Sequence, residues 1–257
     1  MAESGVLYDE SNHVGIITIN RPEARNALTW AAYAELERLV RETTARCLVI
    51  TGTDPAFCSG DDVKQVMGGG DRPPLTSVSI PRLTPAADSL LHTNVPVIAA
   101  VNGAAVGWGM ELALMADIRV ASDRAKFGEL FVLRGLVCDA PGLGRLAQAV
   151  GREKTAELLF TGDVIDAAEA LRIGLVGRVV PHAELLPSAL GLANRIATNP
   201  PLAISALKSG LRSTLDPDWN EVGEWVSSTL TRLFQTADHR EGVKSFLERR
   251  PPNFTGH

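Results

Sequence analysis

The sequence predicts an α/β fold, and two observations carry that prediction. In the first half, short runs of β-branched residues alternate with stretches whose apolar residues recur at helical spacing. From about residue 151 onward the pattern changes to helices, interrupted by a single short strand. Alternation of strands and helices is typical of an α/β core.

The strands of the first half are short and apolar. Residues 14–19 (VGIITI) and 47–51 (CLVIT) predict two of them, and residues 29–45 between them predict an amphipathic helix. Residues 95–101 (VPVIAAV) predict a third strand, with its proline near the start, where a missing N–H is tolerated. Residues 118–121 predict a fourth.

The second half is mostly helical. One strand is expected at 176–180, and the expected helices cover residues 152–160, 166–174, 183–197, 201–212 and 219–235. The segment Gly68–Pro85, between the strands expected at 47–51 and 95–101, is rich in Gly and Pro. We expect a mobile surface loop there, over a site.

Composition excludes several classes of protein. Of 257 residues, 45% are hydrophobic and 21% charged, which excludes disorder and collagen. A net charge of -5 gives no global attraction to nucleic acid or an anionic membrane. The three cysteines lack CxxC spacing, so neither a disulfide framework nor a zinc cluster is expected. With no leader-like start, the protein is expected in the cytoplasm.

Common catalytic motifs are missing from the sequence. It contains no GxGxxG after a strand, no GK[ST], no GxSxG and no HExxH, which argues against a Rossmann cofactor, nucleotide hydrolysis and a serine esterase. The five histidines have no ligand-like spacing, so no metal site is expected.

Two segments stand out as candidate sites. In Pro55–Lys64 a strand ends at a small-residue turn, and Asp61 and Asp62 open a helix. This is either an ordinary capped helix start or a turn whose free N–H, that of Ser59, donates to a ligand oxygen.

The second segment, Asn102–Asp117, leads from a buried strand through three glycines into a nearly all-apolar helix. Glu111 lies in its first turn and is expected to be buried, either as a functional acid or as a stabiliser of its own helix N-terminus. The backbone N–H of Trp108 lies at the same helix start, where the positive end of the helix dipole attracts an anion. Together with Ser59 it would make an oxyanion hole.

Five ordered motifs resemble the enoyl-CoA hydratase/isomerase (crotonase) superfamily over essentially the whole chain. They are NRPEARNAL at 20–28, PAFCSGDDV at 55–63, the segment VIAAVNGAAVGWGMELALMADIRVAS, then KFGELFVLRGLVCDAPGLGRL, and the terminal DHREGVKSFLERRPPNFTG. The resemblance implies a superhelical ββα core at 1–195 that binds an acyl-CoA thioester and a helical oligomerisation region at 196–257. It also implies homotrimers, and homohexamers made of two trimers.

The resemblance assigns roles by position. The N–H groups of Ser59 and Trp108 become the oxyanion-hole donors, although Trp108 replaces the family's usual glycine and is alternatively a packed core aromatic. Arg25 and Ala27 lie where the family binds adenine and ribose phosphate, and Arg25 is alternatively an exposed arginine that binds nothing. The substrate-binding set is completed by Gly60, Asp61 and Phe131.

The acid/base residues depart from the hydratase pattern. Glu111 matches one of the two hydratase glutamates, whereas the other falls on Phe131. Glu129 would replace that second glutamate if its side chain lay on the same face of an extended strand as Phe131. Asp139 occupies the place of an aspartate used by dienoyl-CoA isomerases, by the isomerase of the phenylacetyl-CoA epoxide and by aroyl-CoA dehalogenases. A loop aspartate is alternatively a turn former or helix cap.

The sequence therefore predicts a cytoplasmic acyl-CoA enzyme in which Glu111 and Asp139 shift a carbon–carbon double bond. Hydration of trans-2-enoyl-CoA is the alternative, weakened by Phe131, and nucleophilic catalysis by Asp139 comes third. A non-catalytic CoA- or RNA-binding oligomer is a further alternative. The isoelectric point of 5.6 and the lack of a Lys/Arg run count against RNA. No cofactor is expected, because coenzyme A is part of the substrate, and neither nucleic acid nor a membrane is expected as a partner.

Overall fold

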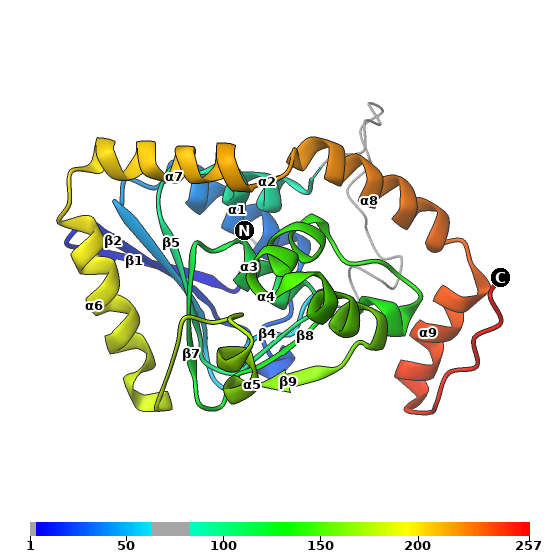
Figure 1. Ribbon diagram of the computed structural model, residues 1–257. Helices are drawn as coiled ribbons and strands as arrows, with labels where there is room; N and C mark the ends of the chain where they lie inside the picture. The colour runs from blue at the N-terminus through cyan, green and yellow to red at the C-terminus, as the bar shows by residue number, and fades with distance from the viewer. Residues whose placement is uncertain (1–3, 63–82) are drawn as a thin grey trace.

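The computed structural model describes residues 4–62 and 83–257 and shows strands wrapped by helices, with a helical arm at the C-terminal end (Figure 1). Most of the loop expected at Gly68–Pro85 lies outside the described residues. The same holds for the helix expected to open at Asp61 and Asp62. Of that stretch, Asp61 is described and forms an isolated parallel bridge with Leu28.

Six strands form the larger sheet. Their order is β1-β2-β3-β5-β7-β10. They cover β1 Val6–Ser11, β2 Val14–Ile19, β3 Cys47–Gly52, β5 Val97–Val101, β7 Ile118–Ser122 and β10 Arg178–Val180. The first pair is an antiparallel hairpin, and the other neighbours are parallel. Because β3 and β5 are buried along their whole length, their sequences are continuous apolar runs.

A smaller sheet lies beside the first and positions the site. It has the order β4-β6-β8-β9, with β4 Ala56–Cys58, β6 Ala104–Val106, β8 Lys126–Gly128 and β9 Val164–Asp166. The pairs β4–β6 and β6–β8 are parallel. The candidate segments following β4 and β6 therefore leave neighbouring strands at the same edge.

Three helices pack close to the two sheets. α1 (Trp30–Glu42) begins at Thr29, whose hydroxyl accepts the Ala32 N–H at 3.2 Å, and α2 (Pro85–His92) begins in the same way at Thr84. α3 (Trp108–Met115) is buried on every side, which explains its lack of an amphipathic pattern.

The remaining helices lead to the C-terminal end. They are α4 Ala140–Thr161, α5 Ala167–Arg172, α6 Leu185–Ala197, α7 Pro201–Leu215, α8 Trp219–Leu233 and α9 Ala237–Glu248. α6 covers the outer face of the larger sheet and builds a second apolar core with β2, β3, β5 and β7. α7 and α8 extend along one side of the molecule toward α9 (Figure 1).

An ion pair between the buried Lys208 and the more exposed Asp117 fastens α7 to the larger sheet. The Lys208 ammonium lies 2.7 Å from Oδ2 of Asp117 and donates to the carbonyl of Val95 at 2.8 Å. The same Oδ2 also accepts the Val97 N–H at 2.7 Å. The helical arm, which consists of α7, α8 and α9, is thereby anchored to the larger sheet at α7.

The α/β prediction is confirmed, and the elements expected from periodicity are present near their expected bounds. The motif at 20–28 directly follows the hairpin β1–β2 and contains a short 3₁₀ turn at Pro22–Ala24. The division of the chain at residue 195 stays a prediction, although α6 itself ends at Ala197.

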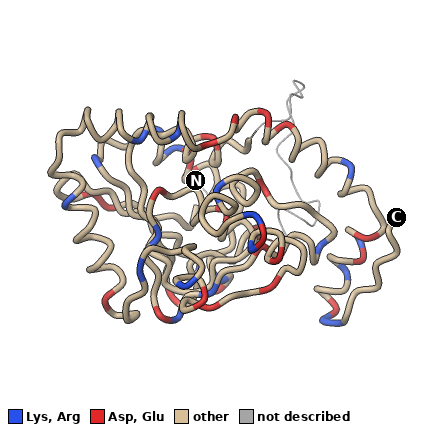
Figure 2. The backbone as a smooth tube through the Cα atoms, in the orientation of Figure 1, with Lys and Arg blue, Asp and Glu red and all other residues tan. Residues whose placement is uncertain are grey.

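Basic and acidic residues are both spread over the described chain. In the backbone trace, Lys and Arg are interspersed with Asp and Glu (Figure 2). Across residues 4–62 and 83–257, no helix combines the length and the apolar character needed to cross a bilayer. All three cysteines, Cys47, Cys58 and Cys138, are buried free thiols.

Candidate active site

The turn after β4 and the start of α3 pack directly against each other. A Cβ on Gly109 would clash with the carbonyl oxygen of Cys58, so no larger residue fits there without movement. Gly107 has a φ of 55°, which allows the sharp entry into α3. The two segments singled out in the sequence thus meet at one point of the fold.

The two expected oxyanion donors differ in their present partners. Trp108 N–H is at the first position of α3, where no helical carbonyl is available, and it has no acceptor among the described residues. The Ser59 N–H instead donates to the carbonyl of Arg25 at 3.1 Å. The N–H of Ser59 is therefore not free, contrary to the expectation from its small-residue turn.

Glu111 is fully buried, and its carboxylate binds the start of α4. Oε1 accepts the N–H of Asp139 at 2.9 Å, and Oε2 accepts the N–H of Gly142 at 2.8 Å. Burial raises the pKa of Glu111 well above its ordinary range, and the charges of Glu129 and Asp139 raise it further. Glu111 thus stabilises the N-terminus of α4 rather than only that of its own helix.

Asp139 occupies the position before α4 but does not cap it with its side chain. Glu111 accepts the N–H of Gly142, which a capping aspartate at position 139 would bind, so the Asp139 carboxylate is not the cap of α4. Burial raises the pKa of Asp139 to about 7, and the charge of Asp61 adds to the increase. A side-chain hydrogen bond from Trp108 opposes it. The capping role considered for Asp139 is not what the structure shows.

Glu129 is a second fully buried acid near this site. Only 1% of it is exposed, and neither carboxylate oxygen has a hydrogen-bond partner. Burial and the charge of Asp139 raise its pKa well above its ordinary range. The extended strand assumed for residues 129–131 is wrong, because β8 ends at Gly128 and Leu130–Arg134 form a 3₁₀ helix that contains the partly exposed Phe131. The alternation of faces along a strand does not apply here.

Tyr33 belongs to the site, although its spacing indicated only a core position of the helix at 29–45. Its hydroxyl donates to Oδ1 of Asp61 at 2.6 Å. Its ring meets that of Trp108 edge-on, with centroids 4.6 Å apart and an interplanar angle of 89°. A tyrosine one turn into an amphipathic helix gives no sequence signal of such a contact.

The expected coenzyme A segment lies beside the turn after β4. Leu28 N–H donates to the carbonyl of Gly60 at 2.8 Å, and Asp62 N–H donates to the carbonyl of Leu28 at 2.9 Å. Arg25 is exposed with a left-handed φ of 52°, whereas Ala27 is buried. The structure therefore brings Arg25, Ala27, Gly60 and Asp61 into one region, and their contact with a substrate stays a prediction.

Comparison with known proteins decides the family. The sequence pattern of the family described as enoyl-CoA hydratase/isomerase matches residues 9–257. The chain belongs to the enoyl-CoA hydratase/isomerase family. Its crotonase-type fold agrees with that of its solved relatives, as the resemblance had implied.

Three similar proteins illustrate the range of this enoyl-CoA hydratase/isomerase family. The (E)-benzylidenesuccinyl-CoA hydratase of Thauera aromatica is 37% identical over 98% of this chain and 99% of its own. The crystal structure of an enoyl-CoA hydratase/isomerase from Pseudoalteromonas atlantica T6c has a TM-score of 0.89 at 28% identity, covering 98% of this chain and 100% of that one. A monofunctional enoyl-CoA isomerase from M. smegmatis has a TM-score of 0.69 at 32% identity, covering 87% and 99%.

The enoyl-CoA hydratase/isomerase family accounts for an acyl-CoA substrate without fixing the reaction, because its members include hydratases and isomerases. In the part of the chain that the structure describes, no three His, Cys, Asp or Glu side chains are grouped so as to hold a metal ion. Glu111, Glu129 and Asp139 form a group of neighbouring acids whose charges act on one another.

Proposed function

We propose that the protein stabilises the enolate of an acyl-CoA thioester and shifts a carbon–carbon double bond, with Glu111 and Asp139 transferring the protons. The observation that carries this proposal is that Glu111 binds the backbone N–H groups at the start of α4, so the Asp139 side chain does not cap that helix. Two carboxyl groups from separate elements suit a reaction that removes one proton and returns another.

Asp139 is the better base of the pair. It is partly exposed, and its pKa of about 7 lets it accept a proton near neutral pH. It takes the γ-proton, and the electrons of that C–H bond form the new double bond between the β- and γ-carbons. The former double-bond pair moves toward the thioester carbonyl as an enolate. Glu111, whose raised pKa favours the protonated form, then returns a proton at the α-carbon.

The enolate oxygen is assigned to the N–H groups of Trp108 and Ser59. An oxyanion donor contributes about 3–4 kcal/mol to transition-state stabilisation. Trp108 N–H supports this role, because it is at a helix N-terminus and has no acceptor in the described structure. Ser59 N–H can serve only after leaving the carbonyl of Arg25, so the proposal includes a local shift of the Arg25 loop on binding.

Coenzyme A binding is assigned to the loop around Arg25 together with Ala27, Gly60, Asp61 and Phe131. Arg25 is the cation of this set, and its exposed guanidinium suits a phosphate contact. No separate cofactor is needed, because the coenzyme arrives as part of the substrate.

Hydration is a second candidate reaction, and one observation favours it. Glu129 provides a buried carboxyl group without a hydrogen-bond partner, and its charge acts on Glu111. A water molecule between the two would complete a pair of acids such as hydration requires. Phe131, at the place of the second hydratase glutamate, argues against it.

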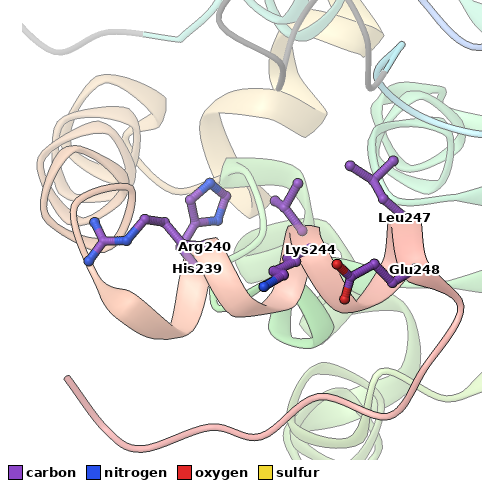
Figure 3. Close-up of a pocket in the computed structure, with 6 residues that line it drawn as sticks. His239, Arg240, Lys244, Leu247 and Glu248 are labelled. Atoms are coloured by element: carbon purple, nitrogen blue, oxygen red, sulfur yellow. The ribbon is translucent and has the colours of Figure 1, made fainter.

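We also propose that the helical arm assembles the protein into trimers or hexamers. Large apolar side chains are exposed along it: Leu202, Leu207, Leu211, Leu215, Trp225, Phe234, Phe246 and Leu247. A surface pocket of about 360 Å³ also lies against α9 and is lined by residues such as His239, Lys244 and Leu247 (Figure 3). A closed symmetric assembly would cover these surfaces. Sedimentation as a stable 27.4 kDa monomer at micromolar concentration would refute it.

The reaction is tested by offering the purified protein two substrates of equal chain length. One is a trans-2-enoyl-CoA, and the other is the isomer with its double bond between the β- and γ-carbons. Interconversion of the two without formation of 3-hydroxyacyl-CoA supports isomerisation. Rapid formation of 3-hydroxyacyl-CoA supports hydration, and conversion of neither substrate contradicts both assignments.

A further inference from the structure

The two turns that carry the proposed oxyanion donors touch each other through their backbones. Gly60, one residue after Ser59, packs closely against the start of α3. A Cβ on Gly60 would lie 3.3 Å from the backbone nitrogen of Trp108 and 3.1 Å from the carbonyl oxygen of Val106. The distance between the N–H groups of Ser59 and Trp108 therefore depends on how these two turns are held relative to each other.

The start of α3 has no side-chain cap. The helix follows Gly107, which has no side chain to accept the N–H groups of the first turn, and the N–H of Trp108 has no acceptor among the described residues. Packing of the indole instead helps to fix this end of the helix, since only 3% of Trp108 is exposed. A displacement of the indole would therefore move the backbone N–H with it.

Tyr33 contacts both turns. Its hydroxyl donates to Oδ1 of Asp61, two residues after Ser59, at 2.6 Å, a length typical of a hydrogen bond to a charged acceptor. Its ring meets the Trp108 ring edge-on, with centroids 4.6 Å apart and an interplanar angle of 89°, an arrangement that aromatic pairs prefer. One side chain of α1 thus connects the turn after β4 to the start of α3.

The backbone before α1 is bonded to the turn after β4. Leu28 donates its N–H to the carbonyl of Gly60 at 2.8 Å and pairs with Asp61 in an isolated parallel bridge. The start of α1 and this turn therefore form one hydrogen-bonded unit. Tyr33 joins that unit to Trp108.

We propose that Tyr33 is a positioning residue that sets the distance between the N–H groups of Ser59 and Trp108. The Asp61 carboxylate anchors Tyr33 through its hydroxyl. This inference rests on the proposed function, in which the two N–H groups bind the thioester oxygen. It applies to isomerisation and to hydration alike, because both reactions place negative charge on that oxygen.

The carbonyl of a bound thioester reports the two donors without any turnover. Butyryl-CoA labelled with ¹³C at the thioester carbon has no double bond to shift or hydrate, and its C=O stretching frequency falls when N–H groups donate to the oxygen. In wild type, isotope-edited infrared spectra should show a lower frequency for bound than for free butyryl-CoA. The lowering should be smaller in Tyr33→Phe, which loses the hydroxyl anchor, and smallest in Tyr33→Leu, which also loses the ring contact.

Tyr8→Phe is the matched control. It removes another tyrosine hydroxyl that donates to a carboxylate oxygen at 2.6 Å, Oε2 of Glu10, in the edge strand β1 of the larger sheet. The bound carbonyl frequency in Tyr8→Phe should equal that of wild type. A change confined to the Tyr33 variants would therefore reflect the position of the donors and not the loss of a tyrosine hydroxyl as such.

Kinetics separate positioning from binding. We expect kcat to fall about tenfold in Tyr33→Phe, which loses one hydrogen bond. In Tyr33→Leu it should fall about 100-fold, because a misplacement of about 1 Å is enough for such a loss. KM should change little in either variant, because the donors act mainly in the transition state.

A double-mutant cycle tests Asp61 as the anchor. If Asp61 acts through the Tyr33 hydroxyl, kcat of the double variant Tyr33→Phe with Asp61→Ala should equal that of the lower single variant. Losses that multiply would refute this role of Asp61.

The infrared outcomes distinguish this inference from the proposed function. If wild type leaves the carbonyl frequency of butyryl-CoA as it is in water, the proposed oxyanion hole is wrong and the inference falls with it. If wild type lowers the frequency and both Tyr33 variants lower it equally, the oxyanion hole stands and the positioning role is wrong. A graded loss of the lowering in Tyr33→Phe and Tyr33→Leu supports both.

Discussion

The backbone N–H of Asp139 lies 2.9 Å from Oε1 of Glu111, so one carboxylate of the site holds the backbone that presents the other. This bond joins α3 to the start of α4 across 28 residues of sequence. It fixes the spacing of the two acids independently of any substrate. The proposed reaction depends on that arrangement.

Asp139→Asn is expected to reduce isomerisation by about 100- to 10,000-fold, because an amide cannot accept the γ-proton. The backbone N–H that binds Glu111 is retained, so the fold of the site should be preserved. The affinity for coenzyme A should change little, because the binding surface lies elsewhere. Steady-state kinetics and calorimetric titration with a saturated acyl-CoA measure the two effects. A wild-type kcat in Asp139→Asn would return Asp139 to a structural role.

The same substitution should change how stability depends on pH. The pKa of Asp139 is raised from 3.8 to about 7, so its neutral form stabilises the fold below about pH 4, and that contribution is lost as the pH rises through 7. Asp139→Asn avoids this loss and should gain stability relative to wild type between pH 4 and 7, by at most about 4 kcal/mol. Urea unfolding at pH 4.0 and pH 8.0 measures the gain. An equal difference at both values would show that Asp139 does not titrate in this range.

Gly109→Ala should destabilise the protein by about 1–3 kcal/mol or more, because the new methyl group would meet the Cys58 carbonyl. Activity should fall as well, since the start of α3 carries Trp108 and Glu111. Gly191→Ala in α6 is the matched control, because a Cβ there meets nothing within 4 Å. It should be neutral or stabilising by up to about 1 kcal/mol. Thermal unfolding of both variants tests the close approach of the two turns.

Phe131→Glu is expected to increase hydration of crotonyl-CoA at least about tenfold, because it restores a second acid at the hydratase position. Phe131→Gln, which adds polarity without an acid, should give no gain. Efficient hydration by wild type, with no further gain in Phe131→Glu, would mean that another acid already acts as the second hydratase acid. Glu129→Gln would then identify whether that acid is Glu129.

Much of the fold could be predicted from the sequence, because its longer elements have clear apolar patterns. The buried strands β3 and β5 and the helices α1, α6, α7 and α8 follow directly from β-branched runs or helical spacing. The smaller sheet was not predicted, because β4, β6, β8 and β9 have three residues each and show no periodicity. The strand β1 was missed because VLYDES is polar over half its length.

The site was predictable in composition but not in its contacts. Glu111 could be placed because a carboxylate in an all-apolar helix is conspicuous, and the fold confirms that it is buried. The engagement of Ser59 N–H by Arg25 and the contact of Tyr33 with Trp108 depend on tertiary packing. No local sequence pattern predicts these contacts. The 3₁₀ helix after Glu129 likewise overrides the extended conformation that its sequence permits.

The most direct test of the proton-transfer pair is hydrogen exchange into a trans-2-enoyl-CoA in D₂O, resolved by carbon position with NMR. Wild type should place deuterium at both the α- and γ-carbons, since each proton passes through a carboxyl group of the site. Asp139→Asn should lose exchange at the γ-carbon by at least about 100-fold. Exchange at the γ-carbon that continues at the wild-type rate in Asp139→Asn and disappears in Glu111→Gln would contradict the account and assign both proton transfers to Glu111.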